Sequence, residues 1–264
     1  MRLGRLFVTG AMVAATLGFM SPAEASHSWG GYHWARTSNP FTLKLGDNVT
    51  SAWDPYLANA TADWSASAVL DTTVVPGSAK PQVCRAKAGT VQVCNAAYGS
   101  NGWLGIASIS ITAGTHITQG TVKLNDTYFN TTSYNTPAWR ALVTCQEVGH
   151  TFGLNHQDEN FSNANLGTCM DYTNDPSTNQ HPNTHDYQQL DLIYAHPDSS
   201  TTVAALATAG SASPANERGV DRGPAGAPGD WGRLVSGSES PRHVAVYERD
   251  FGGGDKEVTF VTWA

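Results

Sequence analysis

The sequence predicts an α/β (α+β) domain. Two observations lead to this prediction. Segments in which polar and apolar residues alternate are interleaved with segments whose apolar residues recur at helical spacing. The chain of 264 residues is also 40% hydrophobic and contains eight tryptophans. That is enough apolar material for a sizeable core, and it excludes a chain that is disordered throughout.

The elements of the main domain, residues 26–196, are predicted from start and stop signals. Asp54 followed by Pro55 is typical of a helix N-cap with proline at the first helical position, and Thr136-Pro137 opens a second helix with an apolar stripe at i, i+3, i+4 and i+7 spacing. The predicted order is a strand at 41–45, a helix at 54–67, strands at 69–75, 90–94, 103–112 and 117–124, the helix from 136, and a helix at 185–195.

Residues 1–25 have the organisation of a secretory signal peptide. Two arginines precede an uncharged, mostly apolar run at 6–20, and Ala-Glu-Ala at 23–25 is a small-x-small cleavage signal. The apolar run is too short to span a bilayer, and no later stretch approaches the roughly 20 apolar residues that a membrane helix needs. We therefore expect a secreted, extracellular protein with no membrane contact after cleavage.

The composition changes near residue 197. Residues 197–240 are rich in Ala, Ser, Gly and Pro, which predicts a flexible linker because such a stretch buries too little apolar surface to offset its ordering entropy. Residues 241–264 contain two alternating segments around a Gly-rich turn, which predicts a β-hairpin. An isolated hairpin is marginally stable, so this one needs to dock on the main domain.

The four cysteines agree with export. An even number in an oxidising compartment suggests two disulfides, with three possible connectivities. We favour Cys84–Cys94, which closes a short loop, and Cys145–Cys169, which ties the second helix to a loop downstream. The absence of a C-x-x-C pair disfavours a structural zinc site made of cysteines.

The second helix carries side chains that suit a metal ion. It reads QEVGHTFGLNH from Gln146 to His156. Gln146 and His150 are four residues apart and share one helical face, with Glu147 beside it. Gly153 permits a positive φ, which ends the helix and brings His156 back toward the same ion. We therefore expect a metal ion between these side chains, with Glu147 in reach of a metal-bound water.

These residues resemble the signature of the metzincin clan of zinc endopeptidases, H-E-x-x-H-x-x-G-x-x-H followed by a Met-turn. The residues that match at family spacing are Glu147, His150, Gly153, His156 and Met170. The resemblance spans about residues 41–196. It implies a zincin domain with a mixed twisted sheet, an active-site helix, a Met-turn and a C-terminal helix, and it implies Zn²⁺ as the cofactor.

The resemblance also assigns roles to two residues of the Met-turn. Met170 is expected to pack beneath the site, since a thioether is a poor zinc ligand. Tyr172 resembles a tyrosine of the astacin and serralysin branches, which lies near zinc and helps to bind the transition state. The strand at Ile117–Leu124 is expected, by analogy, to be the edge that aligns an extended peptide.

One position departs from the signature, because Gln146 stands where the family has its first histidine. A carboxamide oxygen is a poorer ligand for zinc than an imidazole nitrogen. Three outcomes are open. Gln146 binds zinc through its oxygen, or another residue such as His181, His185 or Tyr172 completes the ligand shell, or the site is inactive.

These inferences lead to a secreted zinc endopeptidase in which Glu147 takes a proton from zinc-bound water. Its partner is then a protein or peptide substrate, and the chain is expected to be a monomer. Nucleic acid is excluded as a partner because the formal net charge is −7 and only 14% of residues are charged. The alternative is a non-catalytic binding protein on the same scaffold. A carbohydrate-binding module is a third possibility, supported by the number of tryptophans alone.

Overall fold

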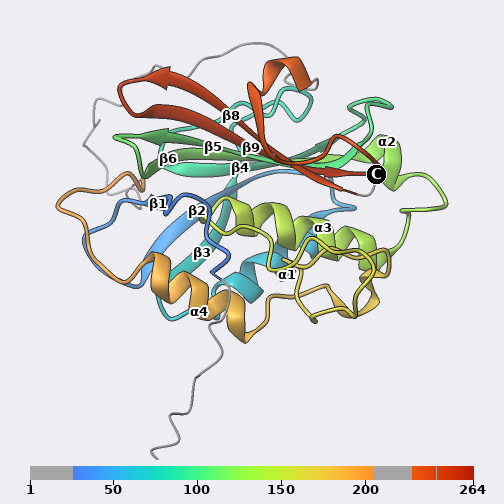
Figure 1. Cartoon of the computed structure of the whole chain (residues 1–264), viewed down its shortest axis with the longest axis horizontal. Coiled ribbons are helices and arrows are strands. Elements are labelled where there is room, and N and C mark those ends of the chain that lie inside the picture. Colours follow the sequence, from blue (N-terminus) through green and yellow to red (C-terminus); the bar gives the residue numbers. More distant parts are fainter. Residues whose placement is uncertain (1–25, 205–227, 242) are drawn as a thin grey trace, which may run out of the picture.

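The computed structural model describes residues 26–204, 228–241 and 243–264, which form a broad sheet with its longer helices on one side (Figure 1). The predicted signal peptide at 1–25 lies outside the described residues. So does the middle of the predicted linker, residues 205–227.

The sheet has nine strands, and the helices are short. The strands are β1 (His33–Trp34), β2 (Phe41–Asn48), β3 (Leu70–Pro76), β4 (Thr90–Ala96), β5 (Trp103–Thr112), β6 (His116–Asn125), β7 (Arg233–Gly237), β8 (Val244–Gly252) and β9 (Asp255–Trp263). The helices are α1 (Asp54–Trp64), α2 (Asp126–Phe129), α3 (Pro137–His150) and α4 (Thr184–Ile193), with 3-10 turns at Pro176–Thr178 and Pro228–Asp230.

The strand order is β3-β2-β4-β6-β5-β9-β8-β7, and β1 pairs with the start of β6. Strands β3, β2, β4 and β6 are parallel, whereas β5 and the three C-terminal strands continue the sheet in antiparallel fashion. A mixed sheet with few helices confirms the predicted α+β class.

The prediction that Ile117–Leu124 forms the sheet edge is wrong. These residues belong to β6, which is paired on both sides, with β4 and with β5. The outer side of β5 is in turn paired with β9. The sequence could not reveal this arrangement, because a hairpin pattern shows which strands pair with each other and not which third strand joins them.

The C-terminal residues form more structure than the predicted linker and hairpin. Residues 197–204 pack along the N-terminal segment, where the Thr202 amide donates to the Ala35 carbonyl (3.0 Å) and the Asp198 amide donates to the Arg36 carbonyl (2.7 Å). Residues 228–240 contain a 3-10 turn and β7. The flexible-linker prediction is therefore wrong at both ends, and the hairpin of β8 and β9 is docked on β5.

The core has two parts. The larger part lies between the sheet and the helices and includes Trp34, Trp53 and Trp64, all fully buried. A smaller cluster packs Ile106 of β5 against residues of the C-terminal segment, namely Trp231, Ala245, Tyr247, Val261 and Trp263. Because successive side chains of a strand point to opposite faces, β9 contributes Phe260 to the larger part and Val261 to the smaller one.

Two helix starts show which local signals were reliable. The Thr136 side chain accepts a hydrogen bond from the Trp139 amide (3.2 Å) and caps α3 as predicted. The prediction that Asp54 caps α1 is wrong: Asp54 is already helical, and the preceding residue, Trp53, makes no side-chain cap. The helix nevertheless begins at the predicted residue 54, and the Trp53 indole N–H donates to Asp126 (2.8 Å), which ties this helix start to α2.

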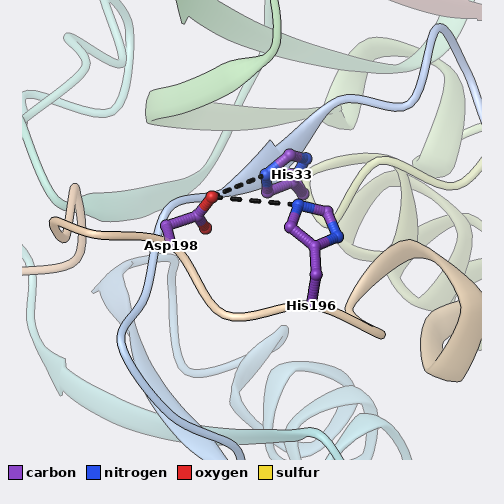
Figure 2. A group of neighbouring side chains, drawn as sticks. All are labelled: His33, His196 and Asp198. Carbon is purple, nitrogen blue, oxygen red and sulfur yellow. Dashed lines mark ion pairs between the residues drawn. The ribbon is translucent and has the colours of Figure 1, made fainter.

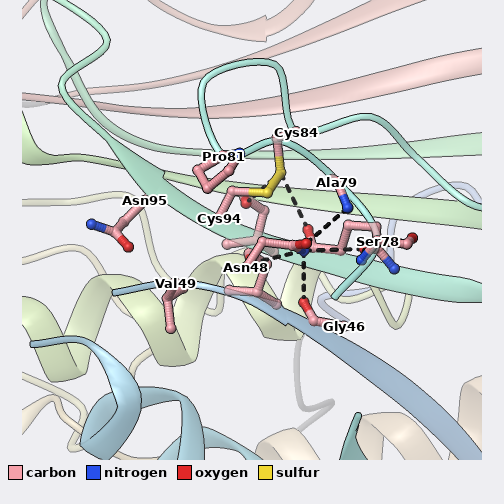
Figure 3. Close-up of a disulfide and its surroundings, with 12 residues drawn as sticks. Gly46, Asn48, Val49, Ser78, Ala79, Pro81, Cys84, Cys94 and Asn95 are labelled. Carbon is pink, nitrogen blue, oxygen red and sulfur yellow. Dashed lines mark hydrogen bonds between the residues drawn. A yellow bond between two sulfur atoms is a disulfide. The ribbon is translucent and has the colours of Figure 1, made fainter. Parts of the chain in front are cut away.

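The two disulfides join the cysteine pairs favoured from the sequence. Cys84–Cys94 ties the loop before β4 to β4 itself, beside Asn48 (Figure 3). Cys145–Cys169 ties α3 to the loop that carries Met170. Two disulfides fit an extracellular protein. Among the described residues, no helix has both the length and the apolar character needed to cross a membrane.

Candidate functional site

The end of α3 brings the predicted site residues together. The helix ends at His150, and Gly153 has a φ of +94°, which turns the chain back. A Cβ at this position would overlap the Tyr32 carbonyl oxygen, so glycine is required for steric reasons as well. After this turn the side chain of His156 faces that of His150.

The two imidazoles meet through their Nε2 atoms, which are 2.9 Å apart. His150 is oriented by its Nδ1–H, which donates to the Leu154 carbonyl (2.9 Å), so its Nε2 carries a lone pair. Burial lowers the pKa of His150 to about 4. Burial and the neighbouring His150 hold the pKa of His156 well below its ordinary value. Both rings are therefore neutral at pH 7, which is the form that binds metals.

Glu147 is fully buried one helical step away. Burial raises the pKa of its carboxyl to about 8. Hydrogen bonds from the Thr262 hydroxyl and the Ala107 amide act in the opposite direction but are the smaller effect. One carboxyl oxygen, Oε1, contacts the Thr262 hydroxyl (2.7 Å), whereas Oε2 has no hydrogen-bond partner. In this closed arrangement the carboxyl is mostly protonated at neutral pH.

Gln146 is held at both ends of its carboxamide. Its Nε2 donates to the Cys169 carbonyl (2.9 Å), and its Oε1 lies 3.0 Å from the Thr262 hydroxyl. The single hydroxyl proton can serve only one acceptor. Glu147 Oε1 (2.7 Å) and Gln146 Oε1 (3.0 Å) are therefore alternative acceptors of the same Thr262 hydroxyl proton, with the shorter contact to Glu147.

Strand β9 covers the site, which the sequence analysis did not anticipate. Thr262 reaches Gln146 and Glu147, and the ring of Phe260 stacks on the His150 imidazole with centroids 4.3 Å apart and an interplanar angle of 4°. Both side chains project from the same face of β9, two residues apart. No signal in the sequence links these C-terminal residues to the helix, because they follow it by more than 100 positions.

Tyr172 lies at the site, beside a cavity. Its ring centroid is 4.7 Å from that of His156, and its hydroxyl donates to the His243 carbonyl (3.3 Å). Burial raises the pKa of this hydroxyl well above its ordinary value, so it remains a donor. A cavity of about 220 Å³ runs between α3, the loop after Met170 and β9, and its lining includes Gln146, Tyr172 and Thr262.

Met170 is buried beneath α3. Its Sδ would lie 2.8 Å from a Cβ placed on Gly149, and Trp64 occupies the other side of that position. Glycine before His150 therefore lets the helix backbone rest on these two side chains.

The other candidate ligands lie elsewhere. The His181 imidazole pairs with Asp63 of α1 (2.8 Å) and is mostly exposed. The His185 ring packs against His27, with centroids 4.9 Å apart. Of the predicted candidates, Gln146 and Tyr172 lie with the two histidines: Gln146 is one helical turn before His150, and the Tyr172 ring packs against His156.

A second group of metal-ligating side chains lies where β1 meets the segment after α4. His33, His196 and Asp198 present atoms within 4.8 Å of one another, and the three could hold a metal ion (Figure 2). No short-range sequence pattern predicts this group. His196 and Asp198 form a short H-x-D pair, but His33 precedes them by more than 160 positions.

Comparison with known proteins adds little to this geometry. No protein-family model matches the chain. No curated protein matches it either. Among solved structures, the crystal structure of myroilysin aligns with 67% of this chain and 89% of its own, at 13% identity and a TM-score of 0.32. So slight a likeness identifies no family, and the function has to be inferred from the site.

Proposed function

We propose that this chain is a secreted zinc-dependent endopeptidase that hydrolyses peptide bonds of a protein or peptide substrate. One observation carries the proposal. Two neutral imidazoles point their Nε2 atoms at each other, beside a buried carboxyl group with one unpartnered oxygen. This combination suits a metal ion with a general base next to it.

The residues present fit a zinc ion. His150 offers the Nε2 lone pair that its bond to Leu154 leaves free, and His156 has an unpartnered Nδ1 that lies 3.9 Å from the Glu159 carboxylate. With the proton of His156 on Nδ1, the lone pair of its Nε2 would be available as a second zinc ligand. Glu159 would then orient the ring. Gln146 is the proposed third ligand, through the Oε1 that Thr262 occupies in the closed arrangement.

Bound zinc would supply a Lewis acid for the scissile carbonyl and a water of lowered pKa. Glu147 accepts the proton of the attacking water, which requires its ionised form. Entry of water and substrate in place of Thr262 removes the burial that raises the pKa of this carboxyl. Tyr172 can turn its hydroxyl from the His243 carbonyl toward the oxyanion of the substrate.

A second candidate function is that of a non-catalytic binding protein. The observation that favours it is Gln146, whose carboxamide makes a hydrogen bond at each end, to Cys169 and to Thr262, without a metal. In that case His150 stacks on Phe260, His156 packs against Tyr172, and the two histidines bind no ion at pH 7. The two functions are separated by measuring bound zinc in the wild type and in His150→Ala. Zinc that is lost with His150 supports the enzyme, and a wild type without zinc supports the binding protein.

The experiment that tests the proposal compares the wild type with Glu147→Gln. The variant keeps the size of the side chain but cannot accept a proton, so we expect hydrolysis of a quenched fluorescent peptide library to fall by about 10²–10⁴-fold with zinc content unchanged. His150→Ala should lose the ion as well. Full activity in Glu147→Gln would show that another base or another site is at work.

A further inference from the structure

Three imidazoles surround one carboxylate oxygen on the side of the molecule where β1 meets β6. Asp198 Oδ1 lies 3.2 Å from His116 Nε2, 3.5 Å from His33 Nε2 and 3.8 Å from His196 Nε2. The rings of His116 and His196 each stand nearly perpendicular to that of His33, with centroids 5.0 Å away. The nitrogens therefore converge on one point from different directions.

The arrangement is held in place from behind. His33 Nδ1–H donates to the Gly31 carbonyl (2.9 Å), so the other ring nitrogen, Nε2, carries a lone pair. In the neutral ring this Nε2 is a free acceptor; it is buried and has no hydrogen-bond partner, although it is aimed at Asp198. Arg36 holds the second carboxylate oxygen through its guanidinium (2.9 Å) and its backbone amide (3.1 Å), which leaves Oδ1 to the histidines.

We propose that His33 Nε2, His196 Nε2 and Asp198 Oδ1 bind a divalent transition-metal ion, with zinc as the ion that this donor set suits best. Tetrahedral zinc with bonds of about 2.0–2.1 Å places its ligand atoms roughly 3.3 Å apart. The two nitrogen–oxygen separations, 3.5 and 3.8 Å, need to contract only slightly. His116 is a positioning residue that hydrogen-bonds to Asp198, and the fourth coordination position is left to water.

Such an ion would have a structural role. It would join β1 to the segment after α4, which already exchanges hydrogen bonds with β1 and its neighbours through Asp198 and Thr202. Anything that binds only the folded chain stabilises it, by an amount that rises with the logarithm of its concentration above the Kd. The proposed ion therefore fastens a segment that contains little hydrophobic surface of its own.

The test uses the full chain and two exposed histidines. His196→Ala removes a proposed ligand, whereas His181→Ala removes a histidine that is equally exposed (61% and 64% of the side chain) and is also paired with an aspartate. We expect His196→Ala, and likewise Asp198→Asn, to weaken one zinc-binding event by at least 10-fold in calorimetric titration and to abolish part of the rise in Tm caused by zinc. His181→Ala should match the wild type, and His116→Ala should lie between.

A crystal soaked in zinc and measured at the zinc absorption edge gives the direct result. An anomalous peak within bonding distance of His33, His196 and Asp198 supports the proposal. Equal zinc binding in His196→Ala and the wild type, or a soaked crystal with no peak beside Asp198, would overturn it. The group would then be an ion-pair cluster only.

A second inference concerns the C-terminal strands and rests on the proposed function. Strand β5 passes directly beside Glu147: a Cβ on Gly105 would lie 2.5 Å from the glutamate Oε1. An extended peptide that adds to the outer side of β5 would therefore cross the site. That side is taken by β9, in register from Trp103 opposite Trp263 to Ile111 opposite Lys256.

We infer that β9 occupies the substrate position and keeps the site closed. Its main chain makes the hydrogen bonds that a bound peptide would make with β5, and Thr262 and Phe260 fill the space next to Glu147 and His150. The side chains on its other face, such as Val261, pack against Ile106 and hold the strand down. Activity then requires that the C-terminal strands leave β5.

The test cuts the chain at one place and keeps all of its residues present. A recognition sequence for a specific exogenous protease is inserted within residues 205–227, so that cutting leaves β7, β8 and β9 attached only by their pairing and packing. Loss of the covalent link lowers the effective concentration of β9 at β5. We expect peptidase activity at nanomolar protein to rise by at least 10-fold after cutting, and to rise further on dilution.

Two variants of the intact chain provide a matched control. Thr262→Val removes the hydroxyl that reaches Glu147, and Thr259→Val removes one on the opposite face of the same strand, which contacts Ser108 (3.1 Å). Only the first should increase activity. An intact chain as active as the cut chain would overturn the inference and leave the proposed function standing. A cut chain that binds zinc through His150 but cleaves nothing would overturn the proposed function itself.

Discussion

Three glycines determine how closely the chain packs around the candidate site, each for a different steric reason. Gly153 has a positive φ and abuts the Tyr32 carbonyl, Gly149 rests on Trp64 and Met170, and Gly105 faces Glu147. Only the role of Gly153 followed from the sequence, because a helix that stops between two metal-ligand candidates requires a turn there. The roles of Gly149 and Gly105 depend on partners that are distant in the chain.

Gly105→Ala tests the contact between β5 and Glu147. The added methyl would lie 2.5 Å from Glu147 Oε1 and 2.7 Å from Val143 Cγ1. We expect the free energy of unfolding to fall by about 1–3 kcal/mol, as for overpacked cores, in urea denaturation followed by tryptophan fluorescence. Gly229→Ala is the control, because among the described residues, its chain neighbours aside, no atom lies within 4 Å of its Cβ position. An unchanged stability of Gly105→Ala would show that β5 is not tightly packed on α3.

Gln146→His tests the position that departs from the metzincin pattern. If Gln146 faces the ion, an imidazole nitrogen in its place should tighten zinc binding by about 10–100-fold, because it is a stronger donor to zinc than an amide oxygen. Competition with a chelator of known affinity measures this change. Zinc affinity equal to that of the wild type would mean that Gln146 does not bind the ion. Tyr172 would then be the first residue to test as third ligand.

At the scale of single elements, the disulfide between Cys145 and Cys169 ties α3 to the loop that carries Met170 and Tyr172. Gln146 donates to the Cys169 carbonyl, so the same loop also orients a proposed ligand. The disulfide therefore affects stability and site geometry together.

Replacing both cysteines by serine separates these effects. Losing a native disulfide in a small secreted domain costs about 2–5 kcal/mol of unfolding free energy, and we expect that loss in chemical denaturation. The matched control replaces Cys84 and Cys94, which lie at β4 away from the histidines. It should lose comparable stability, whereas zinc affinity should fall only in the Cys145/Cys169 variant. Equal zinc affinity in both variants would argue against a role of this loop in the site.

The helix boundaries show how well local sequence patterns predict where an element begins and ends. Helix α3 begins at the predicted Thr136 cap, and α4 (Thr184–Ile193) lies within two residues of the predicted 185–195. Helix α1 begins at the predicted residue 54, although its N-cap is Trp53 and not Asp54, and it ends at Trp64, three residues before the predicted end. Local signals therefore locate helix starts to within about a residue and locate helix ends less closely.

At the scale of the whole molecule, the sequence predicted the α+β class and the residues at the end of α3, since both depend on short-range periodicity and spacing. It did not predict that β9 pairs with β5, because strand pairing between distant segments leaves no local pattern. For the same reason it missed Thr262, Phe260 and the group around Asp198, and it misplaced the sheet edge at Ile117–Leu124.

The smaller hydrophobic cluster should control how firmly the C-terminal strands are attached. Trp231 is buried against Tyr247 and Trp263 on the face of the sheet opposite the helices. We expect Trp231→Ala to weaken this attachment by about 3–5 kcal/mol. Hydrogen exchange of amides in β8 and β9 should then accelerate far more than exchange in β4. Leu192→Ala, at a residue that is 68% exposed, is the control. Uniform acceleration in all strands would show that the sheet opens as one unit.

The position of Thr262 on Glu147 also has a consequence for the order of biosynthesis. Thr262 follows Gln146 by 116 positions. At about 5–20 residues per second, a ribosome needs roughly 6–23 s to travel that distance. Helix α3, His150 and His156 have thus been translated for seconds before β9, which covers them, is made. On the function proposed above, the nascent chain is the peptide nearest to this uncovered site until β9 has been translated.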